Sequence, residues 1–191
     1  MALPTGTLLI DARSAGARLP RELALVASLA ADQAFELVVI DDTRDPRVAG
    51  IARRHGTRHL RLPAAPLGER LANVIPNTNG PVLVFPVIGC LDATYTLLQL
   101  ARRVGADEVD AVILPGSTPG LFARLLGRRQ SDTAAGICLA RHWYDRIGGC
   151  DPRLDRDAIS DLVERLRHCG ARLELATPAA RRRLRPGAPG S

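Results

Sequence analysis

Residues 81–88, PVLVFPVI, form the most strand-like segment of this chain. Their apolar run is unbroken and does not alternate with polar residues. A strand with one solvated face alternates, whereas a strand in the middle of a parallel sheet is covered on both faces and is apolar throughout. We therefore expect residues 81–88 to be a central, buried strand with parallel neighbours.

Shorter apolar segments alternate with amphipathic helical patterns along the rest of the chain. Strands are predicted at residues 7–10, 36–40, 59–62 and 109–114, and helices from Pro20 and at residues 48–55, 67–75 and 93–104. Residues 136–170 then predict a short strand, a helix, a Gly-Gly turn, an acidic loop and a second amphipathic helix. Strands and helices that alternate at this pitch predict a three-layer α/β/α sandwich with a mostly parallel sheet.

The length of 191 residues predicts one domain with a core of its own. From residue 178 the composition shifts to Arg, Pro, Gly and Ala, so we expect a folded domain at residues 1–177 and a disordered tail at residues 178–191. The sequence contains no signal-peptide pattern and no apolar run that approaches the length of a membrane span. We therefore expect a cytoplasmic protein without an integral membrane segment.

The formal net charge is +6, and every basic residue apart from histidine is arginine. An arginine-rich surface can bind nucleic acid, but aromatic residues make up only 3% of the chain and leave few stacking platforms. We expect no nucleic-acid partner. The four cysteines are scattered, with no C-x-x-C pair, and predict neither a zinc site nor a disulfide framework.

Two acidic segments are candidate sites. Asp41 and Asp42 directly follow an apolar strand, and ligands bind at the carboxyl ends of strands in open parallel sheets. Asp155 and Asp157 lie in the loop before the last helix, where a carboxylate can face a cleft and accept a proton from a hydroxyl. Acidic residues in such turns also cap helices, and both interpretations stay open.

The order of these elements, from residue 7 to residue 177, resembles family-2 glycosyltransferases with the GT-A fold. The resemblance rests on VVIDD, on the PVLVF strand and on Gly148-Gly149 followed by the acidic loop. It implies inverting transfer of a sugar from a nucleotide-sugar donor to an acceptor hydroxyl, as in compact bacterial members. It also implies that Asp41 or Asp42, together with Asp11, binds the donor and that Asp157 is the catalytic base.

The chain departs from this family at the D-x-D motif, whose carboxylates hold Mg²⁺ or Mn²⁺. Val87-Ile88-Gly89 stands at the matching place, and these side chains offer no oxygen ligand for a hard divalent ion. Asp92, three residues further on, is a single carboxylate. We therefore assign no metal ligand and leave the cofactor open. The alternative function is a non-catalytic GT-A-like protein that binds a nucleotide sugar or a partner.

Overall fold

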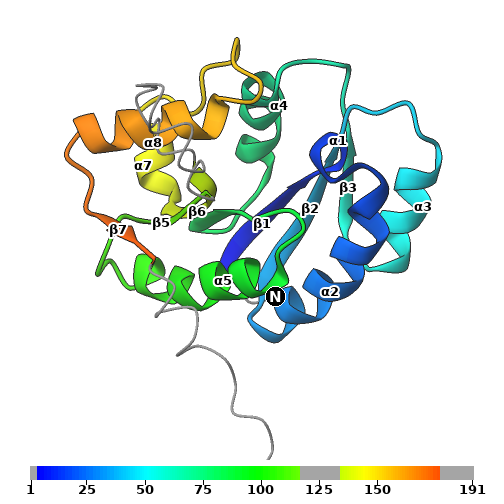
Figure 1. The fold of residues 1–191 in the computed structure, drawn as a ribbon, viewed down its shortest axis with the longest axis horizontal. Coiled ribbons are helices and arrows are strands. Elements are labelled where there is room, and N and C mark those ends of the chain that lie inside the picture. The colour runs from blue at the N-terminus through cyan, green and yellow to red at the C-terminus, as the bar shows by residue number, and fades with distance from the viewer. Residues whose placement is uncertain (1–3, 117–133, 177–191) are drawn as a thin grey trace, which may run out of the picture.

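The computed structural model describes residues 4–116 and 134–176 (Figure 1), and the tail predicted at residues 178–191 lies outside them. The strands are β1 Gly6–Asp11, β2 Phe35–Asp41, β3 Arg58–Arg61, β4 Val82–Phe85, β5 Ala111–Pro115, β6 Ala134–Ala140 and β7 Leu173–Leu175. The helices are α1 Ala12–Ala15, α2 Leu19–Asp32, α3 Arg47–Arg54, α4 Leu67–Val74, α5 Leu91–Gly105, α7 Arg141–Arg146 and α8 Ala158–His168, with 3₁₀ turns at Gly16–Arg18 and Ile75–Asn77.

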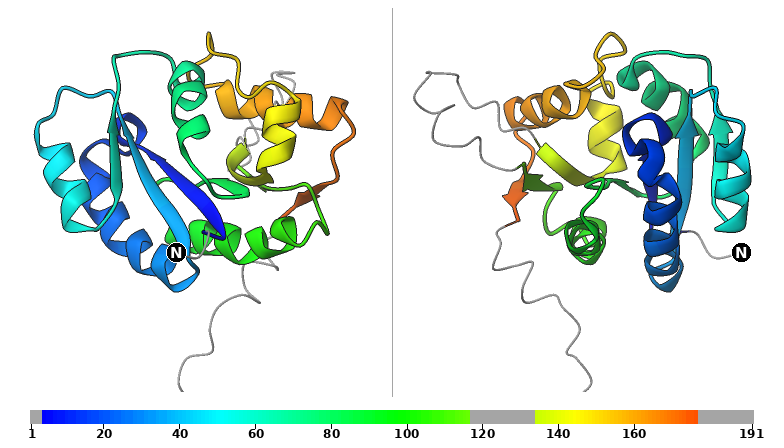
Figure 2. Two further views of the ribbon diagram at one scale, coloured as in Figure 1. Left: turned by 180° about the vertical axis from the view of Figure 1, so that it is seen from behind. Right: turned by 45° about the vertical axis from the view of Figure 1, so that its right-hand side comes forward.

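The described strands form one sheet in the order β3-β2-β1-β4-β6-β5-β7. Strand β1 pairs in parallel with β2 and β4, β2 with β3, and β5 with β7, whereas β6 runs antiparallel to β4 and β5. Helix α5 lies on one side of the β5–β6 half of the sheet, and α7 and α8 lie on the other (Figure 1). Further views show α2 beside α5 (Figure 2). The predicted three-layer sandwich with a mostly parallel sheet is confirmed.

Strand β4 is central and buried, as its apolar run predicts. Val82, Leu83 and Val84 are fully buried, and Phe85 is 8% exposed. One neighbour, β6, is antiparallel, so the expectation of parallel neighbours on both sides is wrong. A continuous apolar run indicates that helices cover both faces of a strand, and it carries no information on the direction of the next strand.

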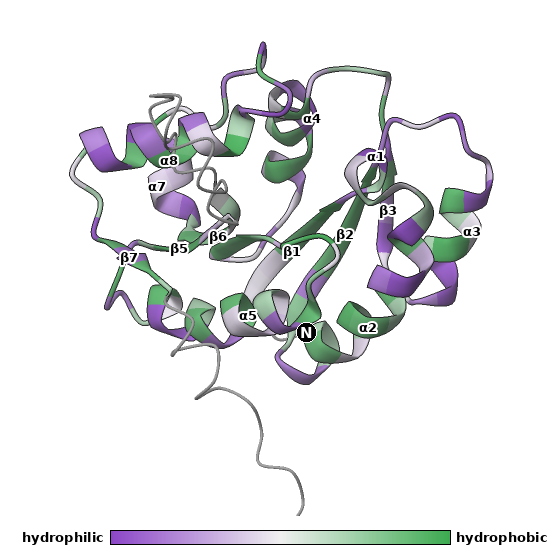
Figure 3. Ribbon diagram, viewed as in Figure 1, coloured by the Kyte–Doolittle hydropathy of each residue, from purple (hydrophilic) through white to green (hydrophobic). Residues whose placement is uncertain are grey.

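The helices bury one apolar face each, in keeping with their sequence patterns (Figure 3). In α8, Leu162, Val163 and Leu166 are buried while polar residues face outward. The Gly-Gly turn that precedes the acidic loop is present: Gly148 and Gly149 have φ values of 81° and 72°, which side chains other than glycine rarely adopt. Within residues 4–116 and 134–176, no helix has the length and apolar character needed to cross a membrane.

Candidate functional site

A cavity of about 330 Å³ opens at the carboxyl ends of β1, β2 and β4. Its wall is mostly apolar, and Asp11 and Ser14 are its polar side chains. The apolar lining residues are Leu9, Ile40, Leu67, Leu71, Phe85, Pro86, Val87, Ile88, Ala135 and Ile159. This edge of an open α/β sheet is where ligands bind in other proteins of this architecture.

Asp11 ends β1 and is the one predicted donor-site residue that lines the cavity. Its Oδ2 accepts hydrogen bonds from the backbone N–H of Ser14, at 3.1 Å, and from the Ser14 hydroxyl, at 2.6 Å. Its Oδ1 accepts a hydrogen bond from Arg70. The carboxylate is therefore held at the cavity wall by Ser14 and Arg70, and its side chain remains 10% exposed.

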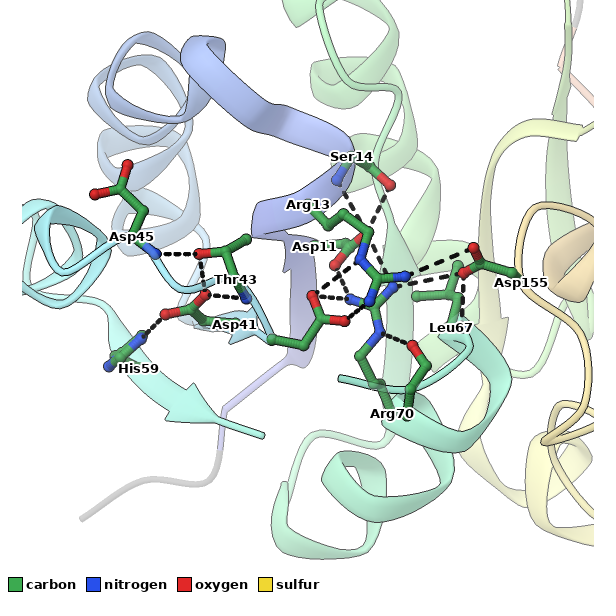
Figure 4. A network of polar contacts seen from close by, with 12 residues as sticks. Asp11, Arg13, Ser14, Asp41, Thr43, Asp45, His59, Leu67, Arg70 and Asp155 are labelled. Carbon is green, nitrogen blue, oxygen red and sulfur yellow. Dashed lines mark hydrogen bonds and ion pairs between the residues drawn. The ribbon is translucent and has the colours of Figure 1, made fainter. Parts of the chain in front are cut away.

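Asp42 directly follows β2 and forms the centre of an ionic cluster with the buried Arg70 and with Arg13, whose side chain is 42% exposed. Figure 4 labels both arginines. The side chain of Asp42 is fully enclosed and that of Arg70 is 1% exposed. Arg13 Nε donates to Asp42 at 3.2 Å, and Arg70 Nε donates to the carbonyl of Ala65 at 3.1 Å. Buried charges are tolerated when they are paired and hydrogen-bonded, and the planar guanidinium satisfies several acceptors at once.

The acidic loop, residues 151–157, reaches this cluster through Asp155 (Figure 4). Asp155 Oδ2 lies 3.6 Å from Arg13 Nη1, and Asp155 Oδ1 lies 3.7 Å from Arg70 Nη2. The same Oδ1 accepts a hydrogen bond of 2.9 Å from the backbone N–H of Leu67, the first residue of α4. Asp155 therefore meets Arg13, Leu67 and Arg70, which are far from it in the sequence, and one of them, Leu67, lines the cavity.

Asp41, the last residue of β2, belongs to a separate group of contacts (Figure 4). Its Oδ1 accepts hydrogen bonds from the backbone N–H and the hydroxyl of Thr43, at 2.9 and 2.7 Å, and its Oδ2 lies 2.9 Å from His59 Nε2. Burial alone raises the pKa of Asp41, but the hydrogen bonds from Thr43 and His59 outweigh it and lower the pKa below its usual value. Asp41 is therefore an ionised carboxylate at neutral pH.

Asp157 occupies the N-cap position of α8 and is exposed to solvent. Its side chain makes no capping hydrogen bond, so the capping interpretation does not account for this carboxylate. It lies two residues before Ile159, whose side chain lines the cavity. Asp161 differs, because it forms a 2.8 Å ion pair with Arg165. Asp157 itself is not among the residues that line the cavity, so the structure shows an exposed carboxylate on the segment that leads into the lining residue Ile159.

Val87 and Ile88, which the sequence resemblance matches to D-x-D, lie in the cavity wall. That match stays a prediction. The turn that Val87 and Ile88 form is held by the backbone N–H of Gly89, which donates to Glu22 Oε1 at 3.0 Å. In the part of the chain that the structure describes, no group of three or more His, Cys, Asp or Glu side chains could hold a metal ion. Aliphatic side chains do not fit a hard divalent cation, which requires oxygen ligands.

Arg70 was not predicted from the sequence, although the pattern of α4 contains a signal for it. Leu67, Leu71 and Val74 mark the face of the helix that points into the protein, and Arg70 lies on that same face. A charged residue on an apolar helical face requires a buried partner of opposite charge. Arg13 has no comparable signal, because α1 is one turn long.

No protein-family model and no curated protein matches the chain. Among solved structures, it resembles glucosyl-3-phosphoglycerate synthase from Mycobacterium tuberculosis in complex with Mn²⁺, UDP and glucosyl-3-phosphoglycerate (TM-score 0.69, 15% identity, 90% of this chain and 69% of that one). It also resembles a mannosyltransferase from Pyrobaculum calidifontis in complex with GDP-Man and Mn²⁺ (TM-score 0.64, 16% identity, 93% of this chain). The chain spans only 56% of that mannosyltransferase. Its fold is therefore the GT-A fold of nucleotide-sugar glycosyltransferases, as its sequence predicts.

Proposed function

We propose that this chain is a glycosyltransferase that binds a nucleotide-sugar donor in the cavity and transfers the sugar to an acceptor hydroxyl with inversion. The observation that carries the proposal is the cavity at the carboxyl ends of β1, β2 and β4, with Asp11 in its wall and the acidic loop at its border. The fold is shared with enzymes whose structures contain UDP or GDP-Man, which supports the choice of donor class.

In this proposal Asp11 contacts the nucleotide-sugar donor, because it lines the cavity and its carboxylate accepts hydrogen bonds. Asp41 and Asp42 follow Ile40, another lining residue, and the contact of either with the donor base stays a prediction. Asp42 is paired with two arginines and Asp41 with His59, and both carboxylates are buried. The choice between Asp41 and Asp42 for the base contact therefore stays open.

Asp157 is the proposed general base. Its carboxylate takes the proton of the acceptor hydroxyl while the hydroxyl oxygen forms a bond to the anomeric carbon of the sugar. The bond between that carbon and the diphosphate oxygen breaks, and its electron pair leaves with the nucleoside diphosphate. Attack on the face opposite the leaving group inverts the anomeric configuration.

A second candidate is a protein that binds a nucleotide sugar without transferring the sugar. The apolar side chains of Val87 and Ile88 in the cavity wall favour this second candidate, because they offer no ligand for a metal ion. Without a metal ion, the negative charge of a departing diphosphate is not compensated in the usual way. Both candidates place the donor in the same cavity, and both lead us to expect donor binding without a divalent metal. They differ in turnover alone.

The proposal is tested by measuring how much nucleoside diphosphate is released from UDP-glucose and from GDP-mannose. Water or an added alcohol serves as the acceptor. We expect release by the wild-type chain, and loss of both release and donor binding in Ile88→Trp, which fills the cavity. Leu25→Trp is the matched control, since Leu25 is an exposed residue of α2. Donor binding without release would favour the second candidate, and equal activity of Ile88→Trp and wild type would refute this cavity as the donor site.

A further inference from the structure

The acidic loop is docked on the first turn of α4 by two hydrogen bonds that the backbone N–H groups of the helix donate. The first N–H groups of a helix have no partner within the helix. Here the N–H of Leu67 donates to Asp155 Oδ1 and the N–H of Gly68 donates to the carbonyl of Leu154, each at 2.9 Å. A carboxylate at this end of a helix is also favoured by the helix dipole. The loop thus satisfies two free donors of α4.

Gly68 permits this contact because it has no side chain. A Cβ atom added at Gly68 would lie 1.9 Å from the carbonyl oxygen of Asp151 and 3.2 Å from that of Leu154. The first distance is far shorter than van der Waals contact, and both neighbours are backbone atoms that cannot rotate away. The loop backbone therefore rests directly on the helix backbone.

The contact continues into the ionic cluster. Arg13 and Arg70, which hold Asp11 and Asp42 at the ends of β1 and β2, both lie within 4 Å of the Asp155 carboxylate. Asp151, the other acidic residue at the start of the loop, pairs with Arg153 inside the loop itself. Asp155 is therefore the acidic side chain through which the loop is tied to the donor side of the cavity.

We propose that Asp155 is a positioning residue: it clamps the acidic loop to α4 and to the Arg13–Arg70 pair, and so fixes the segment that carries Asp157 and leads into the cavity-lining Ile159. The role of Asp157 rests on the proposed function, whereas the clamp rests on contacts of the chain itself. A base must stay within hydrogen-bond reach of the acceptor hydroxyl, and a displacement of about 1 Å can lower the rate about 100-fold. The clamp keeps that geometry without touching the substrate.

Amide hydrogen exchange of the full chain without ligand tests the clamp directly. Asp155→Ala removes a hydrogen bond to a charged acceptor, and we expect exchange in residues 151–157 and at Leu67 to become about tenfold faster. Gly68→Ala should have the same effect, because the added methyl group pushes the loop away. Gly50→Ala is the control, since a Cβ at Gly50 meets no atom within 4 Å. Asp151→Ala should speed exchange at the Arg153 amide, which donates to Asp151 Oδ1 at 2.9 Å, and leave exchange at Leu67 unchanged. Unchanged exchange in Asp155→Ala and Gly68→Ala would overturn the clamp.

Nucleoside diphosphate release from UDP-glucose separates positioning from a merely structural role. We expect Asp155→Ala to lower kcat about 100-fold while the KM for the donor changes less than about twofold. Asp155→Asn, which keeps an oxygen acceptor for the Leu67 N–H, should recover part of kcat. An unchanged kcat in Asp155→Ala would show that Asp155 only stabilises the loop. If the wild type released no diphosphate, the proposed transfer would fail, and the exchange experiment alone would decide on the clamp.

Discussion

Arg70 Nη1 and Asp42 Oδ1 lie 3.3 Å apart, and the two side chains are 1% and 0% exposed. Arg70→Met keeps the length and apolar stem of the side chain but leaves the carboxylate of Asp42 with one arginine partner and that of Asp11 with none. We expect this variant to lose about 3–5 kcal/mol of unfolding free energy, measured by urea denaturation.

The double variant Arg70→Met with Asp42→Asn is the control for this prediction. Because the two residues share one cluster, the second substitution should recover part of the stability that the first removes. Additive losses, or a loss below about 1 kcal/mol in Arg70→Met, would mean that the cluster does not stabilise the fold as a unit.

Replacing Asp157 should affect turnover and leave stability unchanged. Asp157→Asn keeps the shape of the side chain but cannot accept a proton, and we expect nucleoside diphosphate release to fall about 100- to 10,000-fold. The melting temperature should stay close to that of the wild type, because the side chain makes no capping hydrogen bond. Full activity combined with a lower melting temperature would assign Asp157 a structural role.

Two glycines in helices should respond to alanine in opposite ways. Gly50→Ala in α3 has free space around the new methyl group and should stabilise the chain by up to about 1 kcal/mol, because alanine is the better helix former. Gly68→Ala in α4 brings a Cβ to 1.9 Å from a carbonyl oxygen and should destabilise it by about 1–3 kcal/mol. Thermal unfolding of both variants measures the difference. A stabilising Gly68→Ala would contradict the tight contact between the acidic loop and α4.

Asp110 should make stability depend on pH in the acidic range. Hydrogen bonds from Arg172 outweigh burial and lower the pKa of Asp110 from 3.8 to about 2. Because the pKa is lower in the folded chain than in the unfolded one, the ionised carboxylate stabilises the fold above about pH 4 and this contribution is lost as the pH falls toward 2. Since Arg172 is about half exposed, we expect only about 1 kcal/mol.

Asp110→Asn, compared with wild type by urea unfolding between pH 7 and pH 2, checks this prediction. The variant should be less stable at neutral pH, and the difference should shrink steadily below about pH 4. A difference that stays constant over the whole range would show that ionisation of Asp110 does not contribute.

The sequence predicted the layers of the fold because apolar periodicity reports burial. The run at residues 81–88 identified the central strand, and amphipathic spacing located α5 close to its observed bounds. Apolar periodicity did not reveal that β6 is antiparallel to β4, since a strand is buried equally well in either direction. Strand β7, which pairs with β5, was not predicted, because three residues are too few to show a hydrophobic period.

The site was less predictable than the fold. Asp11 was named as a donor-site residue and does line the cavity, because the end of a strand can be read from the sequence. The Arg13 and Arg70 partners of Asp42 come from two other elements, and no local pattern gives a contact between residues 28 or 29 positions apart. The close approach at Gly68 likewise depends on tertiary packing.

Calorimetric titration of the full chain with UDP-glucose and GDP-mannose, in EDTA and then in Mn²⁺, tests the central claim most directly. We expect one of these donors to bind at one site per chain in EDTA, with an affinity that changes less than about tenfold on addition of Mn²⁺, because Val87 and Ile88 supply no oxygen ligand to a metal ion. No binding of either donor under both conditions would contradict the assignment of the cavity as a nucleotide-sugar site. Binding that appears with Mn²⁺ alone would contradict its independence of metal.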